Sequence, residues 1–120
     1  MNSTPNPNGK IAIIGLGYIG LPLAIEFGRR RDVLGLDIDR IRVDELRSGV
    51  DRTLECSSDQ LKSASGLRVS SNESDLDSCS IFIVTVPTPI DSANRPDLSP
   101  LLKASETVAR HLSTGGIVIY

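Results

Sequence analysis

Residues 11–22 read IAIIGLGYIGLP and join a run of four apolar residues to a glycine pattern and then to a helical stretch. Such an apolar run is typical of a β-strand that is covered on both faces. Gly15, Gly17 and Gly20 form the pattern G-x-G-x-x-G, which on its own arises by chance. Its position directly between a strand and a helix is, however, that of a dinucleotide-binding turn.

Each glycine meets a different physical requirement of such a turn. Gly15 permits a tight turn out of the strand, Gly17 has no Cβ and lets a pyrophosphate approach the backbone, and Gly20 allows the helix to pack near the sheet. Unpaired N–H groups at the start of the helix, together with the helix dipole, favour an anion. The alternative is a glycine-rich turn that binds no ligand.

An acidic residue ends the second predicted strand. Asp37 lies 22 positions after Gly15, close to the spacing of about 20 found in dinucleotide-binding units. A carboxylate there accepts hydrogen bonds from the adenosine ribose and repels a 2′-phosphate, which favours NAD over NADP. The alternative is that Asp37 caps the next helix, but Asp39 is the better cap candidate.

Two arginines follow in the next turn, at Arg40 and Arg42. Either side chain suits a contact with adenine or phosphate, and either equally suits a solvated surface position. The two arginines leave an NADP enzyme open as an alternative.

Short apolar runs alternate with helical stretches along the rest of the chain. This alternation predicts parallel strands joined by right-handed crossovers. We therefore expect an α/β fold, a truncated, Rossmann-like, doubly wound sheet of about five strands in the order 3-2-1-4-5. The predicted strands are 11–14, 33–36, 67–69, 81–86 and 117–120, and the predicted helical segments are 21–28, 39–48, 57–64, 73–78 and 99–112.

Four details of these helices are predicted from local signals. Ser57 and Gln60 fit a capping box, and Ser99 before Pro100 fits an N-cap. In the second helix Ile41, Val43 and Leu46 should face inward, and in the last helix Leu101, Ala104, Val108 and Leu112 should form the buried stripe.

Length and composition bound the class of protein. The 120 residues allow one domain at most, and doubly wound domains usually run longer, so we expect part of a longer protein. A net charge of −2 excludes a dedicated nucleic-acid binder. No run of apolar residues is long enough for a membrane span. Residues 1–9 are expected to be a flexible tail and 10–120 the folded domain.

The residue types also bear on location and chemistry. The start of the sequence lacks the features of a secretory signal, and Cys56 and Cys79 make no disulfide framework. We therefore expect a cytoplasmic, reduced protein. Both cysteines are interpreted as ordinary thiols and His111 as a structural residue near a helix end. No catalytic residue and no metal ligand is assigned.

The exit of the fourth strand is the second place to look for a ligand. In sheets of this order ligands bind outside the carboxyl ends of strands one and four. Residues 15–20 should therefore face residues 85–89, where Pro87 and Pro89 make a stiff loop and Thr88 offers a hydroxyl. The alternative is a plain proline stop to the strand.

Four segments together resemble the amino-terminal NAD-binding domain of the UDP-glucose/GDP-mannose dehydrogenases. They are IAIIGLGYIGLPLAIEFG, LDIDRIRVDELRSG, IFIVTVPTPID and PDLSPLLKASETVA. The resemblance extends from Lys10 to Tyr120 and is strongest for the branch that oxidises UDP-N-acetylhexosamines for Vi-type capsule and O-antigen polysaccharides.

The resemblance implies a set of cofactor-binding residues. It places the NAD pyrophosphate on the backbone of the glycine turn, the adenosine ribose on Asp37, a basic residue near the adenosine side at Arg42, and the cofactor wall at the exit of strand four. The residues so implied are Gly15, Leu16, Gly17, Tyr18, Ile19, Gly20, Asp37, Arg42, Val84, Thr85, Val86, Pro87 and Thr88.

The resemblance also implies the chemistry of a longer parent enzyme. In the family a UDP-sugar is oxidised at C6 from alcohol to acid with two NAD, through a cysteine of a later domain, and the enzyme is a homo-oligomer. We expect these 120 residues to bind NAD without turnover and to lack UDP-sugar contacts. The alternative is a regulatory, nucleotide-sensing Rossmann module of the potassium-transport type, in which the Pro87-Thr88-Pro89 exit is not expected.

Overall fold

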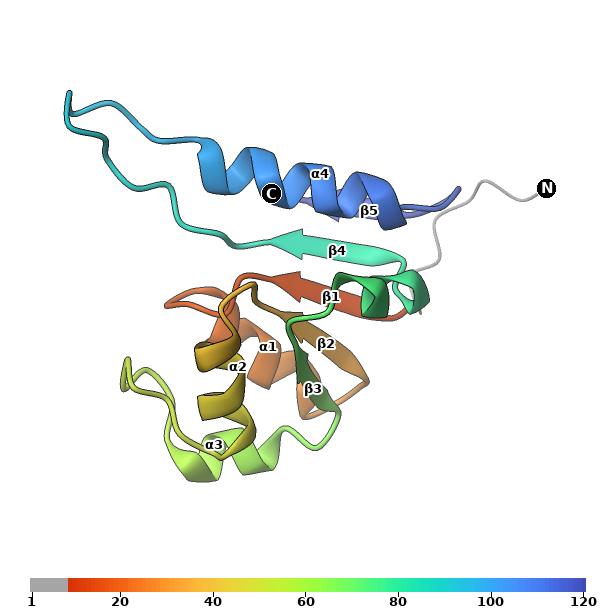
Figure 1. The fold of residues 1–120 in the computed structure, drawn as a ribbon. Helices are drawn as coiled ribbons and strands as arrows, with labels where there is room; N and C mark the ends of the chain where they lie inside the picture. Colours follow the sequence, from red (N-terminus) through yellow and green to blue (C-terminus); the bar gives the residue numbers. More distant parts are fainter. Residues whose placement is uncertain (1–8) are drawn as a thin grey trace.

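In the computed structural model, which describes residues 9–120, five parallel strands lie in the order β3-β2-β1-β4-β5 (Figure 1). The strands are β1 (Ile11–Ile14), β2 (Val33–Leu36), β3 (Leu67–Ser70), β4 (Ile81–Val84) and β5 (Ile117–Ile119). The predicted order and the doubly wound α/β class are confirmed. The order reverses between β1 and β4, so the two crossovers leave the sheet there in opposite directions and open a crevice.

The central strand β1 carries both halves of the core. All four of its residues are buried, and Ile11 lies opposite Val33 of β2 and Ile81 of β4. Successive side chains of a strand point to opposite faces. Ile13 accordingly packs in one apolar cluster and Ile14 in the other, which explains why the run has no polar residue.

Each face of the sheet is covered by helices. The first cluster lies under α1 (Gly20–Gly28), α2 (Arg40–Arg47) and α3 (Ser58–Ser63). The second lies under α4 (Ser99–His111) and the short 3₁₀ helix η1 (Glu73–Ser78). Figure 1 shows α1, α2 and α3 together, with α4 on its own beside β4 and β5.

Two of the predicted helix starts are confirmed. The Asp39 carboxylate accepts hydrogen bonds from the amides of Ile41 and Arg42 at the start of α2. The Ser57–Gln60 capping box is present at the start of α3. Both signals are local, since the cap and its target lie within three residues of each other.

The predicted cap of α4 is wrong. Ser99 is the first residue of the helix, and the N-cap is Leu98, which makes no side-chain cap bond. Asp97 instead accepts hydrogen bonds from the amide and hydroxyl of Ser99, at 2.9 and 2.6 Å. Serine and aspartate both bind backbone amides at helix starts, so the sequence does not distinguish which of two neighbours does so.

Two predicted core positions are also wrong. Ile41 is 65% exposed, and the inward position beside Val43 is taken by Arg42, which is 5% exposed. A buried guanidinium is tolerated only when its N–H groups are hydrogen-bonded, as they are here. Leu112 lies just past the end of α4 and is largely exposed.

The chain between β4 and α4 extends away from the sheet (Figure 1). Within it Ile90 and Pro96 form an isolated antiparallel bridge, and the Asp91 carboxylate accepts the amides of Ala93 and Arg95. The strand itself ends at Val84, two residues before the predicted end.

At the other end of the chain, the expected tail lies outside the described residues except for Gly9. Gly9 is buried, and its carbonyl accepts a hydrogen bond from Arg31. Within residues 9–120, no helix has the length and apolar character needed to cross a membrane.

Candidate functional site

The glycine turn, residues 15–19, connects β1 to α1 at the carboxyl edge of the sheet and is fixed to both neighbouring strands. The Gly15 amide donates to the Leu36 carbonyl of β2 at 2.8 Å. On the other side the Thr85 hydroxyl donates to the Gly15 carbonyl at 2.8 Å. Gly15 has a φ of +96°, which side-chain-bearing residues rarely adopt. The turn is therefore held where strands β1, β2 and β4 end.

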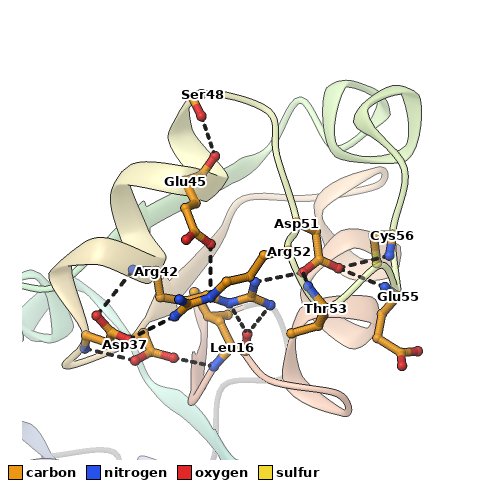
Figure 2. Close-up of polar contacts among 11 residues, drawn as sticks. Leu16, Asp37, Arg42, Glu45, Ser48, Asp51, Arg52, Thr53, Glu55 and Cys56 are labelled. Atoms are coloured by element: carbon orange, nitrogen blue, oxygen red, sulfur yellow. Dashed lines mark hydrogen bonds and ion pairs between the residues drawn. The ribbon is translucent and has the colours of Figure 1, made fainter.

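Leu16 is held on both sides by charged groups from the β2–α2 segment (Figure 2). Its amide donates to Asp37 Oδ2 at 2.9 Å. Its carbonyl accepts from Nε and Nη2 of Arg42 at 2.9 and 2.8 Å. The Leu16 side chain is fully buried against Gly35, where a Cβ would lie 2.9 Å from it. The backbone of the turn thus has one well-defined orientation.

The next three amides are available for a ligand. Among residues 9–120, no acceptor is recorded for the amides of Gly17, Tyr18 and Ile19. The side chains of Tyr18 and Ile19 are exposed, so the turn presents its backbone to a ligand rather than a polar side chain. Free N–H groups at the start of a nine-residue helix favour a negatively charged group.

The space around the glycines fits a pyrophosphate. A Cβ added at Gly17 would meet nothing within 4 Å, so the space beside this residue is open. A Cβ at Gly20 would lie 1.7 Å from the Gly15 carbonyl oxygen and 2.5 Å from Thr85 Oγ1. Gly17 therefore keeps the approach open, whereas Gly20 lets α1 start directly against the turn.

Asp37 lies beside this turn, as its position at the end of β2 predicts. Its Oδ2 accepts the Leu16 amide, and its Oδ1 accepts the Asp39 amide at 3.0 Å. Each carboxylate oxygen has a second lone pair, so the group is still able to accept hydrogen bonds from ribose hydroxyls. Asp39 therefore caps α2, whereas Asp37 orders the turn and keeps lone pairs for a ligand.

A pocket of about 350 Å³ continues from Asp37 toward the other half of the sheet. Its volume lies within the range of small-molecule sites. It is lined by Ile14, Gly15, Leu36, Asp37, Ile38, Val86 and Pro87, and by Pro100, Lys103, Ala104, Glu106, Thr107 and Arg110 of α4. The α4 wall was not predicted from the sequence, although the sheet order brings this helix back over β1 and β4.

The residues at the end of β4 and in the loop after it fall into three groups. Val86 and Pro87 line the pocket. Val84 is a core residue, and the Thr85 hydroxyl is bound to the Ile14 and Gly15 carbonyls, so neither presents its side chain to the pocket. Thr88 is exposed in the loop and is not part of the lining. For Val84 and Thr85 this differs from the expected cofactor wall, because Val84 packs in the core under α4 and the Thr85 hydroxyl is bound to the backbone of β1 and the turn.

Arg42 also differs from its expected position. Its guanidinium is buried beneath the turn, bound to Leu16 and, through Nη1, to Asp51 Oδ1 at 2.7 Å. An arginine committed in this way does not stack on adenine. Asp51 was missed by sequence reasoning, because the loop around it shows no local pattern.

Asp51 is the buried centre of the loop after α2. Its side chain is 0% exposed and accepts from Arg42, from the Thr53 amide and hydroxyl, and from the amides of Glu55 and Cys56. Burial raises the pKa of Asp51, but the hydrogen bonds from Thr53, Arg42 and the Cys56 amide outweigh it and lower this pKa to about 2.

The lowered pKa predicts an acid-labile contribution to stability. The ionised Asp51 stabilises the folded state above its ordinary pKa of 3.8, and this stabilisation, about 2 kcal/mol, is lost as the pH falls through about 2. Urea unfolding of the wild type and of Asp51→Asn at pH 7, 4 and 2 measures this. The wild type should be more stable at pH 7, and the difference should shrink below pH 4. A difference that is constant with pH would contradict the assignment.

The remaining candidate residues lie elsewhere. Cys56 and Cys79 are free and buried, and burial raises the pKa of both thiols, which disfavours the reactive thiolate. His111 Nδ1 lies 2.6 Å from Asp77 Oδ1, and this contact joins α4 to η1. The structure therefore gathers the glycine turn, Asp37, Val86 and Pro87, and leaves these three residues outside.

Comparison with known proteins agrees with this geometry. The family model described as "UDP-glucose/GDP-mannose dehydrogenase family, NAD binding domain" matches residues 9–120. Two curated relatives are the UDP-N-acetyl-D-glucosamine 6-dehydrogenases of Pseudomonas aeruginosa, 56% identical over 111 residues, and of Salmonella typhi, 51% identical over 111 residues. The matches cover 92% of this chain and 26% of each relative.

A solved structure shows the same fold with substantial identity. The UDP-D-ManNAc dehydrogenase of Pyrococcus horikoshii superposes with a TM-score of 0.84 and is 38% identical, over 91% of this chain and 27% of that one. This chain thus spans about a quarter of the length of the proteins that it matches.

Proposed function

Because this chain belongs to the UDP-glucose/GDP-mannose dehydrogenase family, as its NAD-binding domain, we propose that it is the cofactor-binding part of a UDP-N-acetylhexosamine 6-dehydrogenase. When bound, NAD would supply the hydride acceptor for each of two oxidations at C6 of the sugar, and water would supply the second oxygen of the acid. The contribution of these residues is to bind and orient the cofactor. The observation that carries the proposal is the set of free amides at Gly17, Tyr18 and Ile19, with open space where a Gly17 side chain would lie and the Asp37 carboxylate bound to the neighbouring Leu16 amide.

The glycine turn and the pocket bind different parts of the cofactor. The free amides of the glycine turn hold the pyrophosphate, and α1 adds the positive end of its dipole. Asp37 accepts hydrogen bonds from the adenosine ribose, and its negative charge disfavours the 2′-phosphate of NADP. The pocket lined by Ile38, Pro87 and Thr107 would take the adenine. Its apolar walls favour a flat aromatic ring.

The substrate class is proposed from the relatives. Those at 56% and 51% identity are UDP-N-acetyl-D-glucosamine 6-dehydrogenases, which supports a UDP-N-acetylhexosamine, with glucosamine and galactosamine as the two candidates. For the parent enzyme we propose a role in capsule or O-antigen polysaccharide synthesis, which the family resemblance implies and a relative named Protein CapL supports. We propose that these 120 residues bind NAD without turnover, since they match only 26% of each relative and the family resemblance implies that the catalytic cysteine belongs to a later domain.

A titration with NAD tests the binding proposal. Asp37→Ala should weaken NAD binding about tenfold, a loss of about 1.4 kcal/mol, because the ribose loses its acceptor. Asp37→Asn keeps one acceptor oxygen for the Leu16 amide while removing the charge, and should narrow the preference for NAD over NADP. Asp44→Ala, which removes an exposed carboxylate of α2, is the matched control. Calorimetry measures the NAD affinity of the wild type and the three variants, and the NADP affinity of the wild type and Asp37→Asn. Equal NAD binding by wild type and Asp37→Ala would remove the ribose assignment.

A further inference from the structure

We propose that Arg42 is a positioning residue, which aims the Gly17 amide at the cofactor pyrophosphate by holding the Leu16 carbonyl. This inference rests on the proposed NAD site and assigns Arg42 a role within it that does not involve touching the cofactor. The starting observation is that a buried guanidinium, in which each of the three nitrogens donates a hydrogen bond, is bound directly to the backbone of the glycine turn (Figure 2).

The two bonds to the Leu16 carbonyl constrain its direction. Nε and Nη2 of Arg42 approach the same oxygen at 2.9 and 2.8 Å. The guanidinium is planar and its N–H groups form a rigid fork, so two bonds to one oxygen fix an angle as well as a distance. Charge-assisted bonds of this kind are about twice as strong as neutral ones.

Peptide geometry passes this direction on to the next residue. The peptide bond is planar and trans, so the N–H of Gly17 points opposite to the C=O of Leu16. Because the Leu16 carbonyl points to Arg42, the Gly17 amide points away from Arg42, and no side chain or backbone atom crowds the Cα of Gly17. If α1 began one turn earlier, the Gly20 amide would donate to the Leu16 carbonyl. Arg42 binds that carbonyl instead.

Asp51 holds the guanidinium in this position. It accepts Nη1 of Arg42 at 2.7 Å, and its side chain is itself fixed by the amides of Thr53, Glu55 and Cys56. A continuous set of hydrogen bonds therefore runs from the loop of residues 50–56, through Arg42, to the glycine turn (Figure 2). With its side chain 6% exposed, Arg42 would have to break these bonds to reach a ligand directly.

The chain offers a matched control in Arg47 of the same helix. Nε and Nη2 of Arg47 bind the Val69 carbonyl of β3 at 3.0 and 2.8 Å, the same two-bond arrangement at a site away from the turn. Lysine keeps the charge beside Asp51 but is a flexible point donor that lacks the fork. Arg42→Lys and Arg47→Lys therefore remove the same kind of contact, and only the first of them touches the turn.

Two measurements on these variants test the inference. Arg42→Lys should raise the Kd for NAD about tenfold and Arg47→Lys less than about twofold, by calorimetry. In ¹⁵N-resolved NMR spectra without NAD, the Gly17 amide resonance should move in Arg42→Lys and stay in place in Arg47→Lys. Wild-type Kd and an unmoved Gly17 resonance in Arg42→Lys would overturn the inference, and so would weakened binding without movement of that resonance, which indicates direct contact.

A measurement on the wild type keeps the inference testable if Arg42→Lys does not fold. The Arg42 Nε–H resonance should persist with little change on addition of NAD, since its partner is the Leu16 carbonyl in both states. A large change of that resonance would show that the guanidinium turns to the cofactor. If the wild type did not bind NAD, the proposed NAD site would be refuted. The position of the Gly17 resonance in the variants without NAD tests the positioning role of Arg42 separately.

Discussion

Replacement of Gly20 by alanine is expected to leave the chain unable to fold stably. The added Cβ would lie 1.7 Å from the Gly15 carbonyl oxygen, 2.5 Å from Thr85 Oγ1 and 2.9 Å from the Gly15 carbonyl carbon. Gly15 cannot move away without breaking hydrogen bonds, because its carbonyl is bound to Thr85 and its amide to Leu36. We expect a loss of at least about 4 kcal/mol, a large part of the stability of a small domain.

Urea or thermal unfolding measures this loss, and Gly49→Ala is the matched control. Gly49 has a φ of +85° with nothing within 4 Å of an added Cβ, so alanine there carries only the conformational cost, about 1 kcal/mol. Gly20 has no such φ, and its cost is steric. If Gly20→Ala unfolded with the same midpoint as Gly49→Ala, the close approach of α1 to the turn would be refuted.

Replacement of Gly17 by alanine should have little effect on the stability of the fold and a large effect on NAD binding. An added Cβ meets nothing within 4 Å, so the folded chain accepts it and stability should change by less than about 1 kcal/mol. The same methyl group would occupy the space that the pyrophosphate needs next to the free amides. We expect NAD affinity to fall about a hundredfold, or about 2.7 kcal/mol.

Paired titrations separate this effect from general damage to the site. Adenosine lacks the diphosphate, so its binding in the pocket beside Asp37 should be the same for Gly17→Ala and the wild type. Full NAD affinity in a folded Gly17→Ala variant would mean that the diphosphate lies elsewhere. Equal losses for adenosine and NAD would mean that the methyl group distorts the whole pocket.

The sequence predicts most of the fold because most of its signals are local. The apolar run 11–14, the three glycines of the turn and the Ser57–Gln60 capping box each depend on residues within a few positions of one another. The strand order follows from the alternation of elements, together with the handedness of parallel crossovers. Asp37 is predicted from spacing alone, and the structure places it against the turn.

The errors arise where distant residues decide the outcome. Ile41 and Arg42 exchange roles because the partners of Arg42 are Leu16, 26 positions earlier, and Asp51, nine positions later. Periodicity assigns isoleucine to the core and arginine to the surface, and it contains no information on these partners. Thr85 is similar: its hydroxyl binds Gly15, 70 positions away, which only the β1–β4 pairing brings within reach.

The central claim is that a dinucleotide binds with its diphosphate on the amides of the glycine turn. An NMR titration of the ¹⁵N-labelled chain with NAD tests this claim residue by residue. The amide resonances of Gly17, Tyr18 and Ile19 should move most, followed by those near Asp37 and Pro87. The structure also contains a cavity of about 470 Å³ between α2, α3 and β3, lined by Leu46, Leu61 and Leu67 among others. Saturable shifts confined to that cavity, or no shifts at millimolar NAD, would contradict the claim.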